Sequence, residues 1–127
     1  MITYNKYKVL IKGSEETMKF KEVKIEVYIP AEYVVELRDE LNKANACRVG
    51  DYDNCISVTN VKGYWRPLEG TNPFSGKVGE ISEGRECKVE ARCKIEYVRK
   101  AIEAIRKIHP YEEPLFNIVP IINDLFE

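Results

Sequence analysis

The only histidine of the chain opens a short segment whose side chains have the chemistry to bind a metal ion. The segment reads His109-Pro-Tyr-Glu-Glu-Pro114. Imidazole nitrogens and carboxylate oxygens are ligands for divalent cations, so His109, Glu112 and Glu113 are candidate ligands of a divalent metal. Three neighbouring positions would still need ligands from elsewhere, and a histidine at the end of a helix can instead interact with the helix dipole. We therefore favour a structural role for His109 over a metal site.

A second group of candidate residues lies in a stretch rich in glycine and proline. Residues 62–85 hold five of the seven glycines and two prolines, which predicts a long irregular loop. Loops of this length in a compact domain are usually functional or disordered. Arg66 and Glu69 could bind a ligand, or they could form an ion pair inside the loop, and the sequence favours neither. The candidate ligand-binding residues are Tyr64, Trp65, Arg66, Glu69, Asn72 and, from the segment after the histidine, Tyr111.

The same stretch contains partial matches to two nucleotide-related motifs, an RNA-recognition motif and a phosphate-binding P-loop. Lys62-Gly63-Tyr64 matches the start of the RNA-recognition motif's third-strand signature, but Trp65 and the residues after it break that signature. The 20 Lys and Arg against 21 Asp and Glu give a net charge of -1, which offers little attraction to phosphates. The glycines at 76 and 79 have the wrong spacing for a P-loop. The sequence therefore argues against nucleic acid as a partner.

The four cysteines do not have the spacing of a zinc site. Cys87 and Cys93 fall on one face of a predicted strand, about 20 Å apart, and we expect them in the core. Cys47 and Cys55 flank a predicted turn at residues 50–54. The first twenty residues hold no signal-peptide core and no later apolar run is long enough for a membrane span, so we expect a cytoplasmic protein with reduced thiols.

Hydrophobic periodicity predicts the elements that position these groups. Alternation indicates strands at residues 23–29, 55–61, 87–95 and 115–122, the last with Pro120 at an edge or bulge. A spacing of three and four indicates helices from residue 31 to 44 and from 98 to 108. This order predicts an α+β fold, the ferredoxin-like split β-α-β sandwich, with an antiparallel sheet and both helices on one face. We assign residues 23–127 to this domain and residues 1–22 to an N-terminal extension, with an extra edge strand at 7–11 and a turn at 13–16.

Three segments together carry a resemblance to a known family. They are Gly50-Asp-Tyr-Asp-Asn-Cys55, the stretch from Trp65 to Gly79, and His109-Pro-Tyr-Glu-Glu-Pro114. They resemble the YqfO-type domain, the PII-like and CutA-like module inserted in many bacterial dinuclear-metal proteins of the Nif-three family and also found free-standing. The resemblance runs from about Val23 to Pro120. It implies a ferredoxin-like fold that forms trimers with ligand clefts between subunits.

The resemblance also limits what can be carried over. We expect the flanking lobes that hold two metals in the full-length proteins to be absent here, so a GTP-cyclohydrolase-like activity does not transfer. Our first hypothesis is a homotrimeric regulatory or binding module for a small ligand or divalent metal. The loop and the segment after the histidine would meet at a subunit cleft. The alternatives are a metal-dependent hydrolase using His109, Glu112 and Glu113, and a structural protein-interaction module. No residue stands out as catalytic, and an enzyme is the weaker hypothesis.

Overall fold

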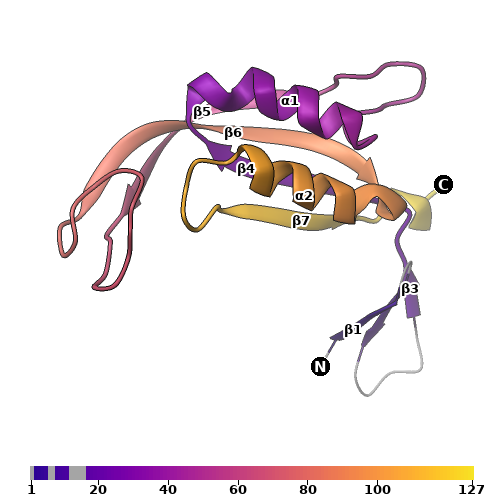
Figure 1. Cartoon of the computed structure of the whole chain (residues 1–127). Helices are drawn as coiled ribbons and strands as arrows, with labels where there is room; N and C mark the ends of the chain where they lie inside the picture. Colours follow the sequence, from indigo (N-terminus) through magenta and orange to yellow (C-terminus); the bar gives the residue numbers. More distant parts are fainter. Residues whose placement is uncertain (1, 6–7, 12–16) are drawn as a thin grey trace.

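A four-stranded antiparallel sheet with two helices on one face forms the main body of the chain (Figure 1). The structure, a computed structural model, describes residues 2–5, 8–11 and 17–127. The strands are β4 (Glu22–Ile29), β5 (Ser57–Trp65), β6 (Ser82–Lys94) and β7 (Phe116–Ile121), in the order β5-β6-β4-β7. The helices are α1 (Val34–Lys43) and α2 (Val98–Ile108). Short 3-10 helices, η1 (Ala31–Tyr33) and η2 (Ile95–Tyr97), precede them, and η3 (Asn123–Leu125) follows β7. This is the ferredoxin-like arrangement that the sequence predicts.

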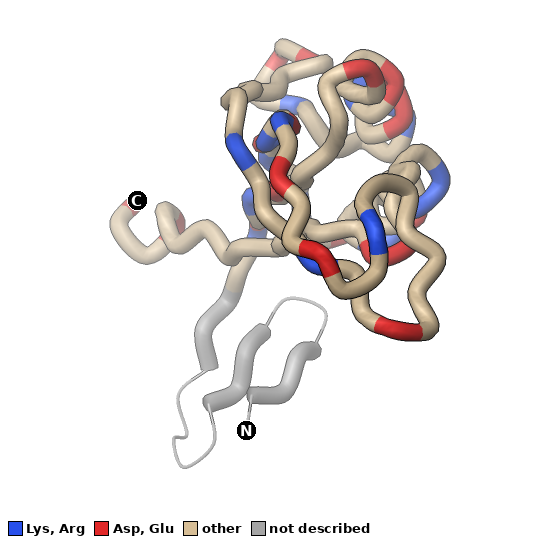
Figure 2. The backbone as a smooth tube through the Cα atoms, turned by 90° about the vertical axis from the view of Figure 1, so that its left-hand side faces the viewer, with Lys and Arg blue, Asp and Glu red and all other residues tan. Residues whose placement is uncertain are grey.

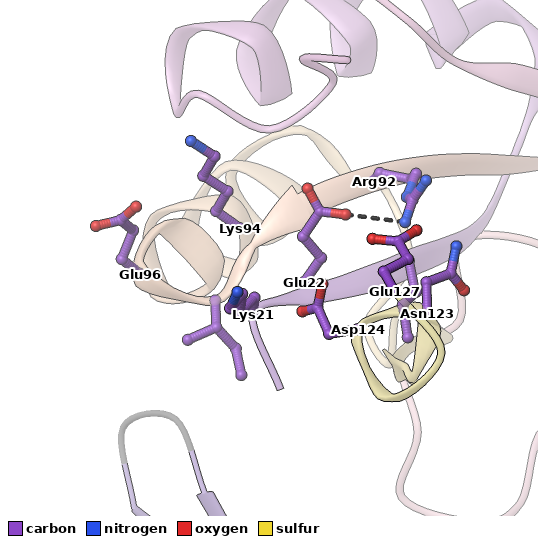
Figure 3. Close-up of a pocket in the computed structure, with 10 residues that line it drawn as sticks. Lys21, Glu22, Arg92, Lys94, Glu96, Asn123, Asp124 and Glu127 are labelled. Atoms are coloured by element: carbon purple, nitrogen blue, oxygen red, sulfur yellow. Dashed lines mark ion pairs between the residues drawn. The ribbon is translucent and has the colours of Figure 1, made fainter. Parts of the chain in front are cut away.

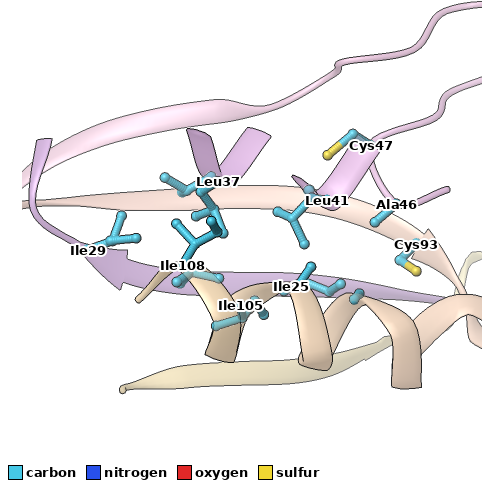
Figure 4. Close-up of a cluster of buried hydrophobic side chains, with 14 of the residues drawn as sticks. Ile25, Ile29, Leu37, Leu41, Ala46, Cys47, Cys93, Ile105 and Ile108 are labelled. Carbon is cyan, nitrogen blue, oxygen red and sulfur yellow. The ribbon is translucent and has the colours of Figure 1, made fainter. Parts of the chain in front are cut away.

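The core lies between the helices and the inward face of β4 and β6. Every second residue of β4 is buried, because side chains alternate between the two faces of a strand. Leu37 and Leu41 of α1 and Ile105 and Ile108 of α2 close the layer from the other side (Figure 4). The buried strand residues are Val23, Ile25, Val27 and Ile29 of β4 and Cys87, Val89, Ala91 and Cys93 of β6. The two cysteines of β6 are thus core residues, as predicted.

The outward face of the sheet carries paired charges. Lys24 Nζ lies 2.9 Å from Glu26 and 3.2 Å from Glu90, and Lys88 Nζ lies 3.4 Å from each of these two carboxylates. Basic and acidic residues are interspersed along the coloured part of the backbone (Figure 2). No helix in the described ranges combines the length and the apolar character that crossing a membrane requires.

The last strand confirms the role predicted for its proline. β7 is an edge strand that pairs only with β4, and Pro120 lies opposite Val23 in this pair. An edge strand tolerates proline, because the missing N–H can face away from the ladder.

The irregular loop is shorter than the sequence predicts. It spans residues 66–81, because β5 continues to Trp65 and β6 already begins at Ser82. Gly63 and Gly84 lie opposite each other in this pair of strands. A Cβ atom at Gly84 would come within 3.1 Å of the Trp65 ring, and one at Gly63 within 2.7 Å of a Glu86 carboxylate oxygen. Both glycines therefore leave space for a neighbouring side chain and do not interrupt the strands.

The described residues before position 20 pair among themselves. β1 (Ile2–Asn5), β2 (Lys8–Ile11) and β3 (Thr17–Lys19) form a separate antiparallel sheet in the order β1-β2-β3. The strand expected at 7–11 is therefore the central strand of this small sheet and does not extend the edge of the larger one. Tyr7 and the turn expected at 13–16 lie outside the described residues.

Candidate ligand pocket

Backbone hydrogen bonds close the loop between β5 and β6 on itself. The amide of Gly79 donates to the carbonyl of Pro67 at 2.8 Å and so joins the two ends of the loop. The amide and the hydroxyl of Thr71 both donate to Leu68 O, at 3.3 and 2.7 Å. Gly76 has a φ of 96°, a conformation that side chains with a Cβ rarely adopt. The loop thus has a defined shape that its own backbone maintains.

The indole of Trp65 attaches this loop to the strand beneath it. Its Nε1–H donates to the carbonyl of Ser75 at 3.0 Å, and its ring lies over the bare backbone of Gly84. The indole supplies the N–H donor, and the missing side chain at Gly84 leaves room for its ring, since a Cβ there would come within 3.1 Å of it. Trp65 therefore holds the loop against the sheet.

The segment after α2, residues 109–114, is held by the buried histidine. His109 Nε2 donates to the carbonyl of Tyr28 in β4, and the amide of Tyr111 donates to His109 Nδ1 at 3.2 Å. Because Nδ1 accepts a hydrogen bond, we assign the proton to Nε2 of a neutral ring. Burial lowers the pKa of His109, and the bond to the Tyr28 carbonyl only partly opposes this effect. The histidine is therefore a neutral structural link.

One hydrogen bond joins the loop to the 109–114 segment, and a second joins that segment to strand β6. The amide of Asn72 donates to Glu112 Oε2 at 2.8 Å, although the two residues are 40 positions apart. The hydroxyl of Tyr111 donates to Glu86 Oε2 of β6 at 3.2 Å, and the ring of Phe74 lies 5.8 Å from that of Tyr111. Burial first, and then the charge of Glu86, raises the pKa of Tyr111 to about 12. The phenol therefore stays protonated and remains a donor.

A cavity of about 280 Å³ lies where these segments converge. Aromatic residues and prolines make up half of its lining residues, and three carboxylates and one guanidinium reach its surface. Its lining consists of Tyr28, Tyr64, Trp65, Arg66, Pro67, Thr71, Pro73, Phe74, Ser75, Glu86, Tyr111, Glu112, Glu113 and Leu115. We call it the loop pocket. It combines an apolar wall with a few polar groups, which is the usual composition of a small-molecule site.

Four of the six predicted ligand-binding residues line the loop pocket. They are Tyr64, Trp65, Arg66 and Tyr111. Glu69 is exposed and is not part of the lining, and Asn72 contributes the backbone amide that binds Glu112. Arg66 and Glu69 form no ion pair with each other, so the ion pair considered as an alternative in the loop is not present.

Sequence reasoning did not find several residues of the loop pocket. Glu86 and Phe74 are the most informative of them, since the first binds Tyr111 and the second packs on its ring. Glu86 immediately precedes the buried Cys87 in an alternating strand, so the sequence places it on the face away from the core. This alternation is the sequence feature that could have identified Glu86. It does not show, however, which loop covers the outward face of the strand at Glu86.

The three residues predicted as metal ligands do not form a metal centre within one chain. Both ring nitrogens of His109 are hydrogen-bonded, and one oxygen of Glu112 accepts from the backbone. Within residues 2–5, 8–11 and 17–127, no three His, Cys, Asp or Glu side chains gather closely enough to hold a metal ion. The residues present therefore do not fit a bound metal.

Two buried cysteines, Cys47 and Cys93, are not suited to act as nucleophiles or metal ligands. Burial raises the pKa of Cys47 to about 12 and that of Cys93 to about 11. The thiolate is the form that attacks electrophiles and binds metals, so both thiols are unreactive at neutral pH. Cys55 is partly exposed, and its amide donates to the carbonyl of Cys47 at 2.8 Å.

A larger cavity, of about 510 Å³, lies at the opposite end of the sheet (Figure 3). Charges of both signs line it, and Arg92 and Glu22 form an ion pair of 2.9 Å there. None of the residues that the sequence analysis selects belongs to it. Its lining consists of Lys21, Glu22, Arg92, Lys94, Ile95, Glu96, Ile121, Asn123, Asp124 and Glu127.

The chain has the ferredoxin-like fold of the CutA proteins. It superposes on CutA1 of Shewanella sp. SIB1 with a TM-score of 0.62 at 19% identity, covering 83% of this chain and 85% of that protein. The CutA protein of Archaeoglobus fulgidus gives a TM-score of 0.60 at 16% identity, over 84% of this chain and 99% of that one. At these identities the likeness concerns the fold alone.

Sequence similarity points to a narrower group. The chain is 35% identical over 101 residues to the GTP cyclohydrolase 1 type 2 homolog of Halalkalibacterium halodurans, and 36% identical over 98 residues to that of Bacillus subtilis. These matches cover 80% and 77% of this chain but only 27% and 26% of those proteins. A Bacillus cereus protein related to NIF3 superposes with a TM-score of 0.70 at 27% identity, over 80% of this chain and 26% of that protein.

These relatives confirm the resemblance to the CutA-like domain of the Nif-three family. The chain spans about a quarter of the length of the relatives it matches. No protein-family model matches the sequence. What the chain shares with these proteins is therefore one segment and its fold.

Proposed function

We propose that this chain is a regulatory or binding module that takes a small ligand in the loop pocket. The observation that carries the proposal is the convergence of two sequence motifs, the 66–81 loop and the 109–114 segment, on one cavity. The bond from the Asn72 amide to Glu112 joins them across 40 residues of sequence. The residues of the loop pocket do not belong to the hydrophobic core cluster. Packing of the core therefore does not explain why the two motifs converge.

The resemblance supports an oligomer for this module. CutA-like and PII-like domains imply a homotrimer with clefts between subunits, and the loop pocket opens on the surface of the single chain. The proposed assembly is therefore a homotrimer whose clefts include the loop pocket, in the cytoplasm. The divalent-cation tolerance named for the Archaeoglobus fulgidus CutA protein keeps a metal among the ligands to be tested.

The hydrolase hypothesis has no observation in its favour. It needs His109 as a ligand or base, and both nitrogens of that ring are already bonded to the backbone. A base must reach the proton that it removes, and a buried ring with no free nitrogen does not. The proposal is therefore a binding function without catalysis.

The experiment is a thermal-shift series on metal-stripped protein with ATP, GTP, Mg²⁺, Mn²⁺ and Zn²⁺ as probes. A ligand that binds only the folded state stabilises it by about 2.7 kcal/mol at a hundred times its dissociation constant, which raises the melting temperature by roughly 10 °C. Tyr64→Ala removes a ring from the cavity wall and should reduce the shift. Tyr52→Ala is the matched control, because Tyr52 is also an exposed tyrosine and lies outside the cavity.

Two outcomes would contradict ligand binding in the loop pocket. A shift that Tyr52→Ala reduces as much as Tyr64→Ala does would place the ligand elsewhere on the chain. The absence of a shift with these probes and with the charged and neutral probes described below would favour the structural interaction module. A metal-specific shift that His109→Ala abolishes would return the metal site to consideration.

A further inference from the structure

The charge of the loop pocket differs from that of the chain as a whole. Glu86, Glu112 and Glu113 face a single cation, Arg66, so the lining has a formal charge of -2, whereas the whole chain has a net charge of only -1. A concave, partly apolar site with an excess of one charge concentrates ligands of the opposite charge. Anionic ligands are disfavoured here for the same reason.

Two of the three carboxylates are fixed in place and still have an oxygen to offer. Glu86 accepts from the Tyr111 hydroxyl through Oε2, and Glu112 accepts from the Asn72 amide, also through Oε2. The Oε1 atom of each carboxylate receives no hydrogen bond from the described residues. Each carboxylate is therefore oriented by one bond and can accept another from a ligand.

Aromatic rings form a large part of the remaining wall. Tyr64, Trp65, Phe74 and Tyr111 line the cavity together with the carboxylates. Aromatic faces carry a partial negative charge that attracts cations. The protein already uses this property here, since Lys62 Nζ lies 5.5 Å from the centroid of the Tyr64 ring. A bare metal ion would gain nothing from these rings, because hard cations need oxygen ligands on all sides.

We infer that the loop pocket binds a planar organic cation, an amidinium or guanidinium group. Its flat face would lie against the aromatic wall and its N–H groups would donate to Glu86 and Glu112. This combination of stacking and paired donation to carboxylates is specific to planar cations, because an ammonium ion offers charge and N–H donors but no flat face to stack. The inference names the ligand class of the proposed binding function and rests on it.

The test uses three probes of nearly identical shape and different charge. Benzamidine is cationic, benzamide is neutral and benzoate is anionic at neutral pH. Isothermal titration calorimetry should give benzamidine a dissociation constant about tenfold lower than that of benzamide, with benzoate the weakest. Because shape is held constant, the ranking reports the charge preference of the site.

Variants of single charges should move the benzamidine affinity in opposite directions. Glu112→Gln should weaken it about fivefold, and Arg66→Ala should strengthen it, because the first removes an acceptor and the second removes the repelling cation. Glu69→Gln is the matched control, since Glu69 lies in the same loop but outside the lining. Glu112 also holds Asn72, so Glu113→Gln provides a second test that breaks no hydrogen bond within the described residues.

Two sources could supply the group, a free small molecule or an arginine side chain of a protein. Titrations with methylguanidine and with the capped peptide acetyl-Gly-Arg-Gly-amide distinguish them. Tighter binding of the peptide would show that the cavity recognises an arginine side chain, and tighter binding of methylguanidine would show that it takes a free ligand. Either result supports the inference.

Three results would overturn the inference. If benzamide or benzoate binds as tightly as benzamidine, the site has no preference for cations, and the proposed binding function still stands. If none of the three probes binds, and neither do the nucleotides and metals of the thermal-shift series, both the inference and the binding function fail. A benzamidine affinity that Glu69→Gln lowers as much as Glu113→Gln does would show only a general charge effect and would also overturn it.

Discussion

The hydrogen bond between Trp65 and Ser75 provides a sharp test of how the 66–81 loop is held. Trp65→Phe keeps an aromatic side chain at this position but removes the indole N–H that donates to Ser75 O at 3.0 Å. A hydrogen bond of this kind contributes about 1 kcal/mol net. This bond links only the loop to β5. We therefore expect its removal to lower the free energy of loop opening and to leave the free energy of unfolding of the core unchanged.

Amide hydrogen exchange followed by NMR measures that opening directly. The amides of Gly79 and Asn72 are the reporters, since each donates within the closed loop or to the 109–114 segment. A loss of about 1 kcal/mol corresponds to exchange about fivefold faster at these two amides. Trp65→Ala also removes the ring packing, and for a partly buried indole we expect a total loss of about 2 kcal/mol and exchange about thirtyfold faster.

The amides of β4 serve as the internal control. β4 is a central strand that pairs on both sides, so its exchange reports global unfolding. If β4 amides accelerate as much as Gly79 and Asn72 do, the loop and the core open together and the reasoning is refuted. Unchanged exchange at Gly79 in Trp65→Ala would refute it differently, by showing that the loop backbone needs no attachment.

Three further predictions concern the stability of the body and the reactivity of its thiols. Burial depresses the folded pKa of His109 below its usual 6.5, so the unfolded chain binds the proton first. The free energy of unfolding in urea should therefore fall as the pH drops below about 6.5, and His109→Asn should remove this slope. Ile105→Ala should lower the free energy of unfolding by about 2–5 kcal/mol, since this side chain is fully buried. In the native protein at pH 7.5, the thiol reagent DTNB should modify Cys55 before Cys47 or Cys93, whose pKa values are raised to about 12 and 11; faster reaction of Cys47 would contradict the burial argument.

The main elements could be predicted from the sequence because their hydrophobic patterns are regular. The alternation at residues 23–29 and 87–95 gives the two central strands, and the spacing at 98–108 gives α2 with both its ends. The ends of β5 and β6 were predicted wrongly, because glycine usually marks a turn. Gly63 and Gly84 are instead needed to fit Glu86 and Trp65 against the backbone, a tertiary requirement that local patterns do not reveal.

The site was only partly predictable for a related reason. Single motifs identified the loop and the 109–114 segment, and only the resemblance indicated that they share a surface. The histidine motif suggested a metal because residue types alone do not show that both ring nitrogens bind the backbone. Glu86 was missed because its role depends on which loop lies above its strand, and this follows from the fold and not from the neighbouring residues.

The unequal lengths of the sheet strands have a mechanical consequence. β4 ends opposite Cys87, so residues 82–86 of β6 pair only with residues 61–65 of β5 and form a two-stranded ribbon beyond the sheet. The ribbon carries Trp65 and the loop, whereas Tyr111 and Glu112 belong to the body. Two-stranded ribbons twist and bend more readily than a full sheet. One wall of the cavity therefore lies on the flexible ribbon and the other on the rigid body. A molecule bound between these walls would oppose bending of the ribbon and would thereby restrict the motion of the 66–81 loop at the end of the ribbon.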